Sequence, residues 1–138
     1  MNIKCVLQNG AKIPTKAHKS DAGFDLYSRE TKCVPKGGSA SFDTGVCVQI
    51  PEGMTAFLKS KSGLNVKYGI QSEGVIDCGY TGSIVVKLYN HSNEDYIVNC
   101  GDKITQLVFL PIPPITITVA DTLEKTERGD KGFGSSGK

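Results

Sequence analysis

The strongest constraint on the fold of this chain is that its apolar residues recur at every second position, not every third or fourth. Three runs show this alternation: Phe42 to Ile50, Ser83 to Tyr89 and Ile104 to Leu110. Successive side chains of a β-strand point to opposite faces, so each run predicts a strand with one buried face. Turn-forming segments separate these runs at short intervals, as is typical of an all-β sandwich or barrel.

Length and charge narrow the classes of protein further. The chain has 138 residues, of which 38% are hydrophobic and 22% charged, and this predicts one compact globular domain. The formal net charge is only +2. Because no broad basic surface is expected, we predict neither nucleic acid nor a membrane as a partner. Any anion site must be formed locally.

The five cysteines include no Cys-x-x-Cys pair, and their odd number argues against a disulfide framework. We interpret them as free thiols in a reducing compartment. The N-terminus lacks a long apolar region, and the most apolar stretch, residues 107–112, is too short to span a bilayer. We therefore expect an intracellular protein, cytoplasmic or nuclear.

Two segments depart from the strand pattern. Residues 62–68 lack alternation and predict a short helix with Ser62 as its N-cap, whose first amides face a possible phosphate. After a last strand expected at 115–119, the sequence becomes charged and then glycine-rich. We expect a β-barrel domain over residues 1–119, followed by a flexible arm over 120–138 that a ligand or a neighbouring subunit orders.

The segment Gly-Val-Ile-Asp-Cys-Gly-Tyr-Thr-Gly at residues 74–82 carries the first candidate chemistry. Asp77 follows an apolar strand, and Tyr80 lies three residues later. A carboxylate at the end of a rigid strand, beside an aromatic ring, suits the activation of water against a flat polar substrate such as a nucleotide. The alternative is structural: Asp77 as a turn residue and Tyr80 as a cross-strand packing residue.

The second candidate is the glycine-rich end of the chain, residues 128–138. Its glycines let backbone amides approach an anion closely, Arg128 adds a charged fork, and its serines add hydrogen-bond donors. Phe133 is the only large apolar residue of this segment. The composition predicts a phosphate cradle with one aromatic lid, against the alternative of an unstructured polar tail.

Five segments, in order, resemble the five motifs of the trimeric dUTP nucleotidohydrolases (dUTPases). They span residues 21–28, 61–64, 74–82, 101–107 and 128–137. The resemblance implies a jelly-roll-like β-barrel that assembles as a homotrimer, in which the C-terminal arm of one subunit closes a site built by the other two. It also implies hydrolysis of dUTP to dUMP and pyrophosphate by in-line attack of water on the α-phosphorus, with Mg²⁺ on the triphosphate.

The same resemblance implies a role for each matched residue. Asp77 matches the general base, and Tyr80 matches the residue that packs against the deoxyribose and excludes a 2′-hydroxyl. Asp25 matches the carboxylate that holds Mg²⁺ through its waters, and Phe133 the aromatic that covers the uracil. Backbone around Gly74 would read the base edge. The other matched positions, which would contact the substrate, are Lys61, Ser62, Gly63, Gln106, Arg128, Gly134, Ser135 and Ser136.

The chain departs from the commonest family pattern at three places. Lys61 stands where arginine is usual, which keeps the charge and loses the bidentate fork. Gly79 stands where an aspartate is common. Asp130-Lys131 replaces a residue and a glycine, so Lys131 must either tolerate the backbone angles of a glycine or shift the loop.

Three other functions compete with this interpretation. A dCTP deaminase of the same fold needs further polar residues, for which Glu73 is the only nearby candidate. Asp43-Thr44-Gly45 matches the Asp-Thr-Gly turn of small dimeric aspartic proteases, but Val46 replaces the usual small residue and no apolar-Gly-Arg segment follows. A nucleotide-sensing regulatory module would keep the scaffold and the site without catalysis.

Overall fold

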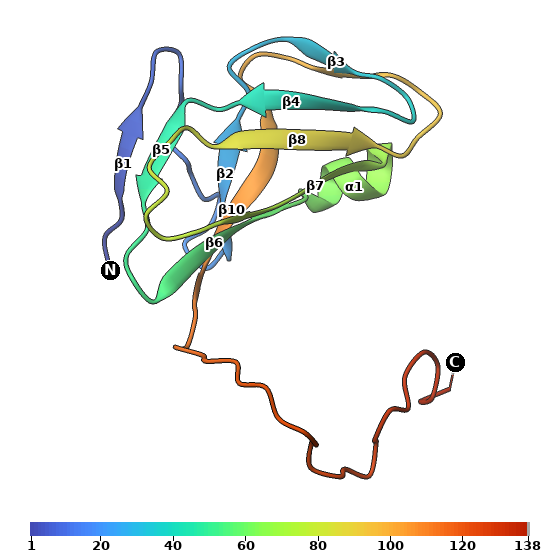
Figure 1. Ribbon diagram of the computed structural model, residues 1–138. Helices are drawn as coiled ribbons and strands as arrows, with labels where there is room; N and C mark the ends of the chain where they lie inside the picture. The colour runs from blue at the N-terminus through green and yellow to red at the C-terminus, as the bar shows by residue number, and fades with distance from the viewer. Residues whose placement is uncertain (138) are drawn as a thin grey trace.

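The structure, a computed structural model that describes residues 1–137, is a curled β-structure with one short helix and an extended C-terminal arm (Figure 1). Helix α1 (Ser62–Tyr68) lies between β6 and β7. The strands are β1 (Lys4–Leu7), β2 (Gly23–Tyr27), β3 (Lys32–Val34), β4 (Ser39–Asp43), β5 (Val46–Gln49), β6 (Met54–Lys59), β7 (Ile70–Ile76), β8 (Val85–Asn90), β9 (Tyr96–Val98) and β10 (Lys103–Pro111). The all-β prediction with a single short helix is confirmed for the described residues.

One six-stranded sheet organises the barrel. Its strand order is β2-β10-β6-β7-β8-β4, and each neighbouring pair is antiparallel. Two small sheets, β1-β5 and β3-β9, complete the structure. The order places β10, near the end of the barrel sequence, between β2 and β6. Segments far apart in the sequence therefore lie side by side in the sheet.

The period-two pattern identifies the buried face correctly. Phe42, Thr44, Val46, Val48 and Ile50 are all buried, and they lie on one side of β4 and β5. The run is two strands, however, and not one continuous strand. The chain turns at Gly45, which has a φ of 68°, a left-handed conformation that glycine adopts without steric cost.

Two local predictions are wrong. Ser62 is the first residue of α1 and not its cap: the N-cap is Lys61, which has an extended backbone and makes no side-chain capping bond. The strand expected at 115–119 is absent, because the last strand ends at Pro111 and residues 112–120 have no regular secondary structure. The alternation there marks a potential strand, but the barrel of this chain offers it no partner.

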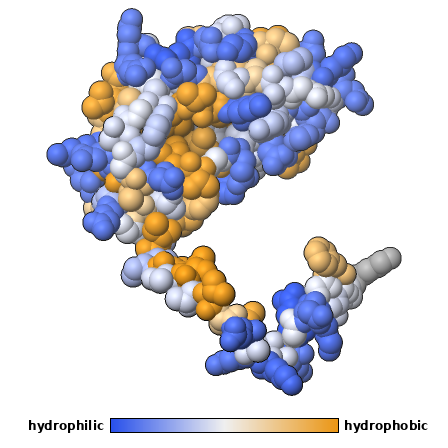
Figure 2. Space-filling view, viewed as in Figure 1, coloured by the Kyte–Doolittle hydropathy of each residue, from blue (hydrophilic) through white to orange (hydrophobic). Residues whose placement is uncertain are grey.

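The arm leaves the barrel after β10 and runs away from it (Figure 1). Every side chain of residues 112–137 is exposed. The part of the arm next to the barrel is apolar, and the part toward its end is mainly polar (Figure 2). The division at residue 119 and the closing role of the arm remain predictions.

All five cysteines are free thiols, as the sequence predicts. Among the described residues, the one helix is far too short and polar to cross a bilayer.

Candidate active site

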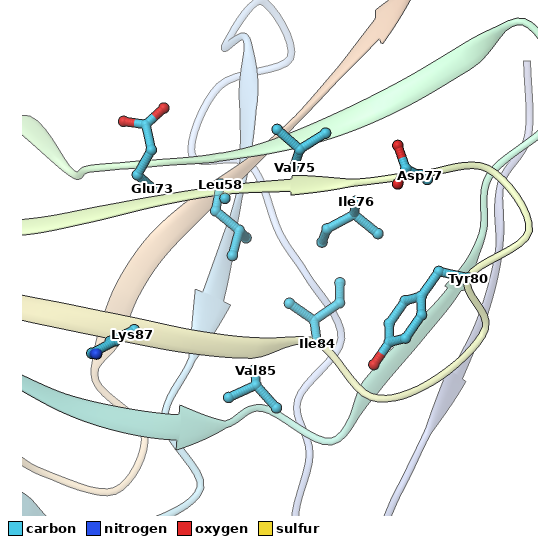
Figure 3. Close-up of a pocket in the computed structure, with 10 residues that line it drawn as sticks. Leu58, Glu73, Val75, Ile76, Asp77, Tyr80, Ile84, Val85 and Lys87 are labelled. Carbon is cyan, nitrogen blue, oxygen red and sulfur yellow. The ribbon is translucent and has the colours of Figure 1, made fainter.

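A pocket lies where strands β7 and β8 separate within the sheet (Figure 3). The two strands pair with each other only over Ile70–Ser72 and Leu88–Asn90. Beyond that ladder, residues 73–76 pair with β6 on one side and residues 85–87 pair with β4 on the other. The facing edges thus carry backbone N–H and C=O groups without ladder partners in the described chain, around a cavity of ≈ 320 Å³.

Glycine at position 74 keeps part of this pocket open. Gly74 pairs with Leu58 of β6, and a Cβ added at Gly74 would lie 3.1 Å from Leu58 Cδ1. A side chain at position 74 would therefore crowd Leu58 and fill space that the pocket now occupies. The predicted contact of the backbone near Gly74 with a flat ring fits this geometry.

Asp77 and Tyr80 lie together at one end of the pocket, on the turn that follows β7 (Figure 3). The turn is closed by a hydrogen bond of 3.3 Å from the Tyr80 amide to the Asp77 carbonyl. Gly79, at its third position, has a φ of 87°. This conformation favours glycine over aspartate and gives a physical reason for the departure seen in the sequence. Asp77 is exposed to solvent and free to meet a substrate.

A second group of predicted residues meets around Asp25 on β2. The Asp25 carboxylate is buried, with 7% of its side chain exposed, and it pairs with two ammonium groups. Lys61 Nζ lies 2.5 Å from Oδ1, and Lys103 Nζ lies 2.8 Å from Oδ2. Gln106 of β10 lies directly opposite Asp25 in the ladder. The structure thus brings together the predicted metal-holding carboxylate, one predicted phosphate-binding lysine and the predicted glutamine.

Lys103 is a member of this group that the sequence analysis missed. It reaches Asp25 because the pairing of β10 with β2 shifts register between Lys103 and Thr105. A bulge of this kind re-aims a side chain, and alternation alone cannot locate it. The available signal was its place in the fourth motif, three residues before Gln106.

The ion pairs keep Asp25 charged. Burial raises the pKa of its carboxyl, but hydrogen bonds from Lys103 and Lys61 lower it more, so the net pKa lies below the usual value. The hydrogen bond to Asp25 correspondingly raises the pKa of Lys103. The two shifts agree in sign, as an attractive pair requires.

We expect Asp25→Asn to destabilise the protein by about 1 kcal/mol near neutral pH in magnesium-free buffer. A depressed folded-state pKa stabilises the fold above the unfolded value of about 4 and loses this effect as pH falls through the folded value. The difference between wild type and Asp25→Asn in urea unfolding should therefore shrink from about pH 7 to about pH 3. Asp121→Asn, at an exposed arm position, is the control, and a pH-independent difference for Asp25→Asn would contradict the assignment.

The Asp25 group fits a magnesium ion that arrives with a substrate better than one held by the protein alone. Among residues 1–137, no cluster of three metal-ligating side chains exists. Mg²⁺ commonly keeps several waters and binds through one or two carboxylates plus substrate phosphates. Each Asp25 oxygen accepts one lysine bond and retains a further lone pair for a metal-bound water.

A third group forms in the arm, where Arg128, Ser135 and Ser136 border one shallow hollow together with Lys131. Lys131 and Arg128 are joined by a backbone hydrogen bond of 3.1 Å. Within residues 128–137, positive φ occurs at Gly129, Phe133, Gly134 and Gly137, and not at Lys131. The loop therefore does not force Lys131 into the backbone angles of a glycine. Phe133 is fully exposed.

These groups stay apart within one chain. Ile76 pairs with Ala56 near the start of β6, whereas Asp25 and Gln106 lie in the row of Lys59 at its end. Asp77 and Asp25 are thus separated by four residues along the strands, about 13 Å, and by three strand spacings of about 4.8 Å. The arm group lies beyond the barrel (Figure 1). One copy holds the parts of the predicted site without assembling them.

The dUTPase family model matches residues 9–137, nearly the whole chain. The chain belongs to the dUTPase family. Its relatives include deoxyuridine 5′-triphosphate nucleotidohydrolases from Yarrowia lipolytica, 41% identical over 99% of this chain and 90% of the relative, and from Clostridium tetani, 40% identical over 96% and 94%. The chain spans almost the full length of both dUTPases.

Solved dUTPase structures agree with this fold. The dUTPase of Staphylococcus bacteriophage 80alpha with dUPNHPP has a TM-score of 0.91 and 31% identity, over 99% of this chain and 98% of that one. A D95N dUTPase of phage phi11 of S. aureus, described with a structural Mg(II) ion, has a TM-score of 0.82 and 28% identity, over 91% and 100%. The predicted dUTPase-type, jelly-roll-like barrel is confirmed.

Proposed function

We propose that this member of the dUTPase family hydrolyses dUTP to dUMP and pyrophosphate. Membership in the family supports this activity, and the observation that carries it to this chain is the pocket between β7 and β8, with Asp77 and Tyr80 on one turn at its end. Such an enzyme keeps uracil out of DNA and supplies dUMP.

The pocket suits a uracil ring because its two edges are backbone. The separated strands offer N–H donors and C=O acceptors in one plane, which can match the edge of a pyrimidine. A cytosine would present the opposite group at its exocyclic position and leave buried partners unpaired, which is a large penalty. In this proposal Tyr80 packs against the deoxyribose, and Phe133 covers the uracil from the arm.

In the proposed reaction, Asp77 accepts a proton from a water molecule, whose oxygen forms a bond to the α-phosphorus. The bond between the α-phosphorus and the oxygen bridging to the β-phosphorus breaks, and pyrophosphate leaves with that electron pair. The protein contributes mainly position and charge to such a transfer. An exposed carboxylate on a turn fixed by the end of β7 is suitably placed to direct the water.

The Asp25 group and the arm supply the proposed phosphate contacts. Lys61 and Arg128 face developing negative charge, while Ser62, Gly63, Gln106, Gly134, Ser135 and Ser136 contribute hydrogen-bonding groups around the substrate. Mg²⁺ would neutralise the triphosphate and be held by Asp25 through metal-bound water. Lys61 would offer a phosphate the point charge of an ammonium in place of the bidentate fork of an arginine.

We infer that the working enzyme is a homotrimer with sites between subunits. The separation of the Asp77 and Asp25 groups within one chain supports this, because a second copy can place its Asp25 group beside the first copy's Asp77. The arm supports it as well. Ile115, Ile117 and Val119 expose alternate apolar side chains that a neighbouring barrel could cover.

We also expect the enzyme to act inside the cell, in the cytoplasm or the nucleus. The free state of all five cysteines is consistent with a reducing compartment.

Two alternatives keep the same fold. A dCTP deaminase would need Glu73, which lines the pocket but pairs with Lys59 at 2.5 Å from Nζ to Oε1. A nucleotide-sensing module would need no base to activate water, whereas this chain has the exposed carboxylate of Asp77 in that place. The Asp43-Thr44-Gly45 segment has a structural role, because Thr44 donates to the Ile84 carbonyl and Asp43 accepts from the Ser83 hydroxyl.

Incubation of the purified protein with dUTP, UTP and the four common deoxynucleoside triphosphates, dCTP among them, tests the proposal. We expect pyrophosphate release from dUTP alone, with dUMP as the second product. Conversion of dCTP to dUTP with release of ammonia would establish a dCTP deaminase instead. Tight dUTP binding without any product would establish the sensor.

A further inference from the structure

The Asp43-Thr44-Gly45 turn, which connects β4 to β5, contacts the segment that follows Tyr80. Thr44 Oγ1 donates to the Ile84 carbonyl at 2.7 Å, and the Thr44 amide donates to the same oxygen at 3.0 Å. The Ser83 hydroxyl donates to Asp43 Oδ1. This turn, forty residues distant in sequence, therefore holds the chain between the Tyr80 turn and β8.

Asp43 is itself held in place from two sides. Arg29 Nη2 lies 3.0 Å from Asp43 Oδ2, and Arg29 Nε donates to the Asp43 carbonyl at 2.9 Å. The Gly45 amide donates to Asp43 Oδ1 at 2.9 Å. Hydrogen bonds from Ser83 and from Gly45 hold the pKa of Asp43 below its usual value. The carboxylate is therefore ionised at neutral pH and accepts bonds only.

The geometry continues from Ser83 to the ring of Tyr80. The Tyr80 hydroxyl donates to the Ser83 carbonyl at 2.9 Å, which folds the ring back over its own turn. Gly82 makes room for this arrangement. A Cβ added at Gly82 would lie 2.6 Å from Tyr80 Oη and 2.8 Å from Cζ. The ring is thus fixed at both ends, by the Asp77–Tyr80 turn and by Ser83.

We propose that Arg29, Asp43 and Ser83 form a positioning network that fixes the Tyr80 ring and thereby sets the selectivity of the enzyme for deoxyribose over ribose. This inference rests on the proposed function, in which Tyr80 packs against the sugar. Exclusion of a 2′-hydroxyl depends on a wall that does not yield, because a ring free to rotate would admit the larger sugar. None of the three residues lines the pocket, so they act through Tyr80.

The test compares kcat/KM for dUTP with kcat/KM for UTP. We expect Ser83→Ala to lower the dUTP-to-UTP ratio by about fivefold, the effect of losing one partly exposed hydrogen bond to a charged group. Asp43→Ala, which also removes the contacts with Gly45 and Arg29, should lower the ratio at least as much. Their effects should not add in the double variant, because both break the same contact. Asp43→Asn keeps an acceptor for Ser83 and should recover most of the ratio. Gly82→Ala, which displaces the ring directly, should lower the ratio most.

Ser41→Ala is the matched control. It makes the same chemical change on β4, and the Ser41 hydroxyl makes no hydrogen bond among residues 1–137. Melting temperatures of all variants separate loss of stability from loss of selectivity. A lowered melting temperature with an unchanged dUTP-to-UTP ratio would show a merely structural role and overturn the inference.

Amide hydrogen exchange makes the test independent of catalysis. We expect faster exchange over residues 78–83 in Ser83→Ala and Asp43→Ala than in wild type and Ser41→Ala. Unchanged exchange rejects the network whatever the enzyme hydrolyses. Failure of the wild-type protein to cleave dUTP rejects the proposed function instead, and the exchange data still decide whether the network orders the turn.

Discussion

Asp77→Asn should lower turnover of dUTP by about 10²–10⁴-fold, the usual contribution of a general base. Asparagine has the same shape as aspartate but cannot accept the proton of the attacking water. Because Asp77 is exposed on a turn closed by a backbone hydrogen bond, we expect the substitution to leave the fold and the pocket edges unchanged. Affinity for a non-hydrolysable dUTP analogue should therefore stay near the wild-type value.

Stopped-flow or steady-state release of pyrophosphate measures the turnover of dUTP, and calorimetric titration with the non-hydrolysable analogue measures the affinity. Asp95→Asn is the control, since it makes the same change in an exposed loop where, within residues 1–137, the carboxylate accepts a hydrogen bond only from the Lys36 amide. Turnover near the wild-type rate in Asp77→Asn would reassign the base. Lost binding together with lost turnover would instead give Asp77 a role in holding the substrate.

The sequence predicts which face of each strand is buried better than it predicts where the strands end. Alternation depends only on which side chains are buried, and Phe42 to Ile50 obey it throughout. The break at Gly45 depends on a left-handed backbone angle, which a glycine permits without requiring. At residues 115–119 the alternation is present, but a strand also needs a partner, and no sequence pattern says whether the same chain supplies it.

The difference between features set by local sequence and features set by pairing of distant segments also explains what could be predicted of the site. The motif around Asp77 is contiguous, so its turn and its tyrosine follow from local sequence, whereas the pocket beside them also needs residues of β6 and β8. The Asp25 group depends on pairing between β2 and β10 and on a bulge, so Lys103 was missed. The Asp43 network joins residues from three distant segments. Its Asp-Thr-Gly sequence resembles a catalytic turn, yet here all three residues bind neighbouring backbone or side chains.

Deletion of residues 128–138 should lower kcat/KM for dUTP by about 10²–10³-fold, because in the proposed reaction this segment supplies an arginine and several donors to the charge of the transition state. The oligomeric mass in analytical ultracentrifugation should not change. The side chains of residues 128–137 are all exposed, and the hydrogen bonds of these residues within the described chain stay in the arm. Phe133→Ala should reproduce part of the loss, whereas Leu123→Ala, at another exposed apolar position of the arm, should not.

A mixing experiment decides whether the arm serves its own Asp77 or that of another copy. Chains with Asp77→Asn keep the arm, and chains lacking residues 128–138 keep Asp77, so each preparation alone is nearly inactive. If base and arm come from different subunits, random trimers of the two regain about a quarter of the sites. Each recovered site then pairs an intact Asp77 from one chain with an intact arm from another. Absence of recovery after subunit exchange, verified by mass, would place the arm over its own subunit, since no mixture can then unite both parts.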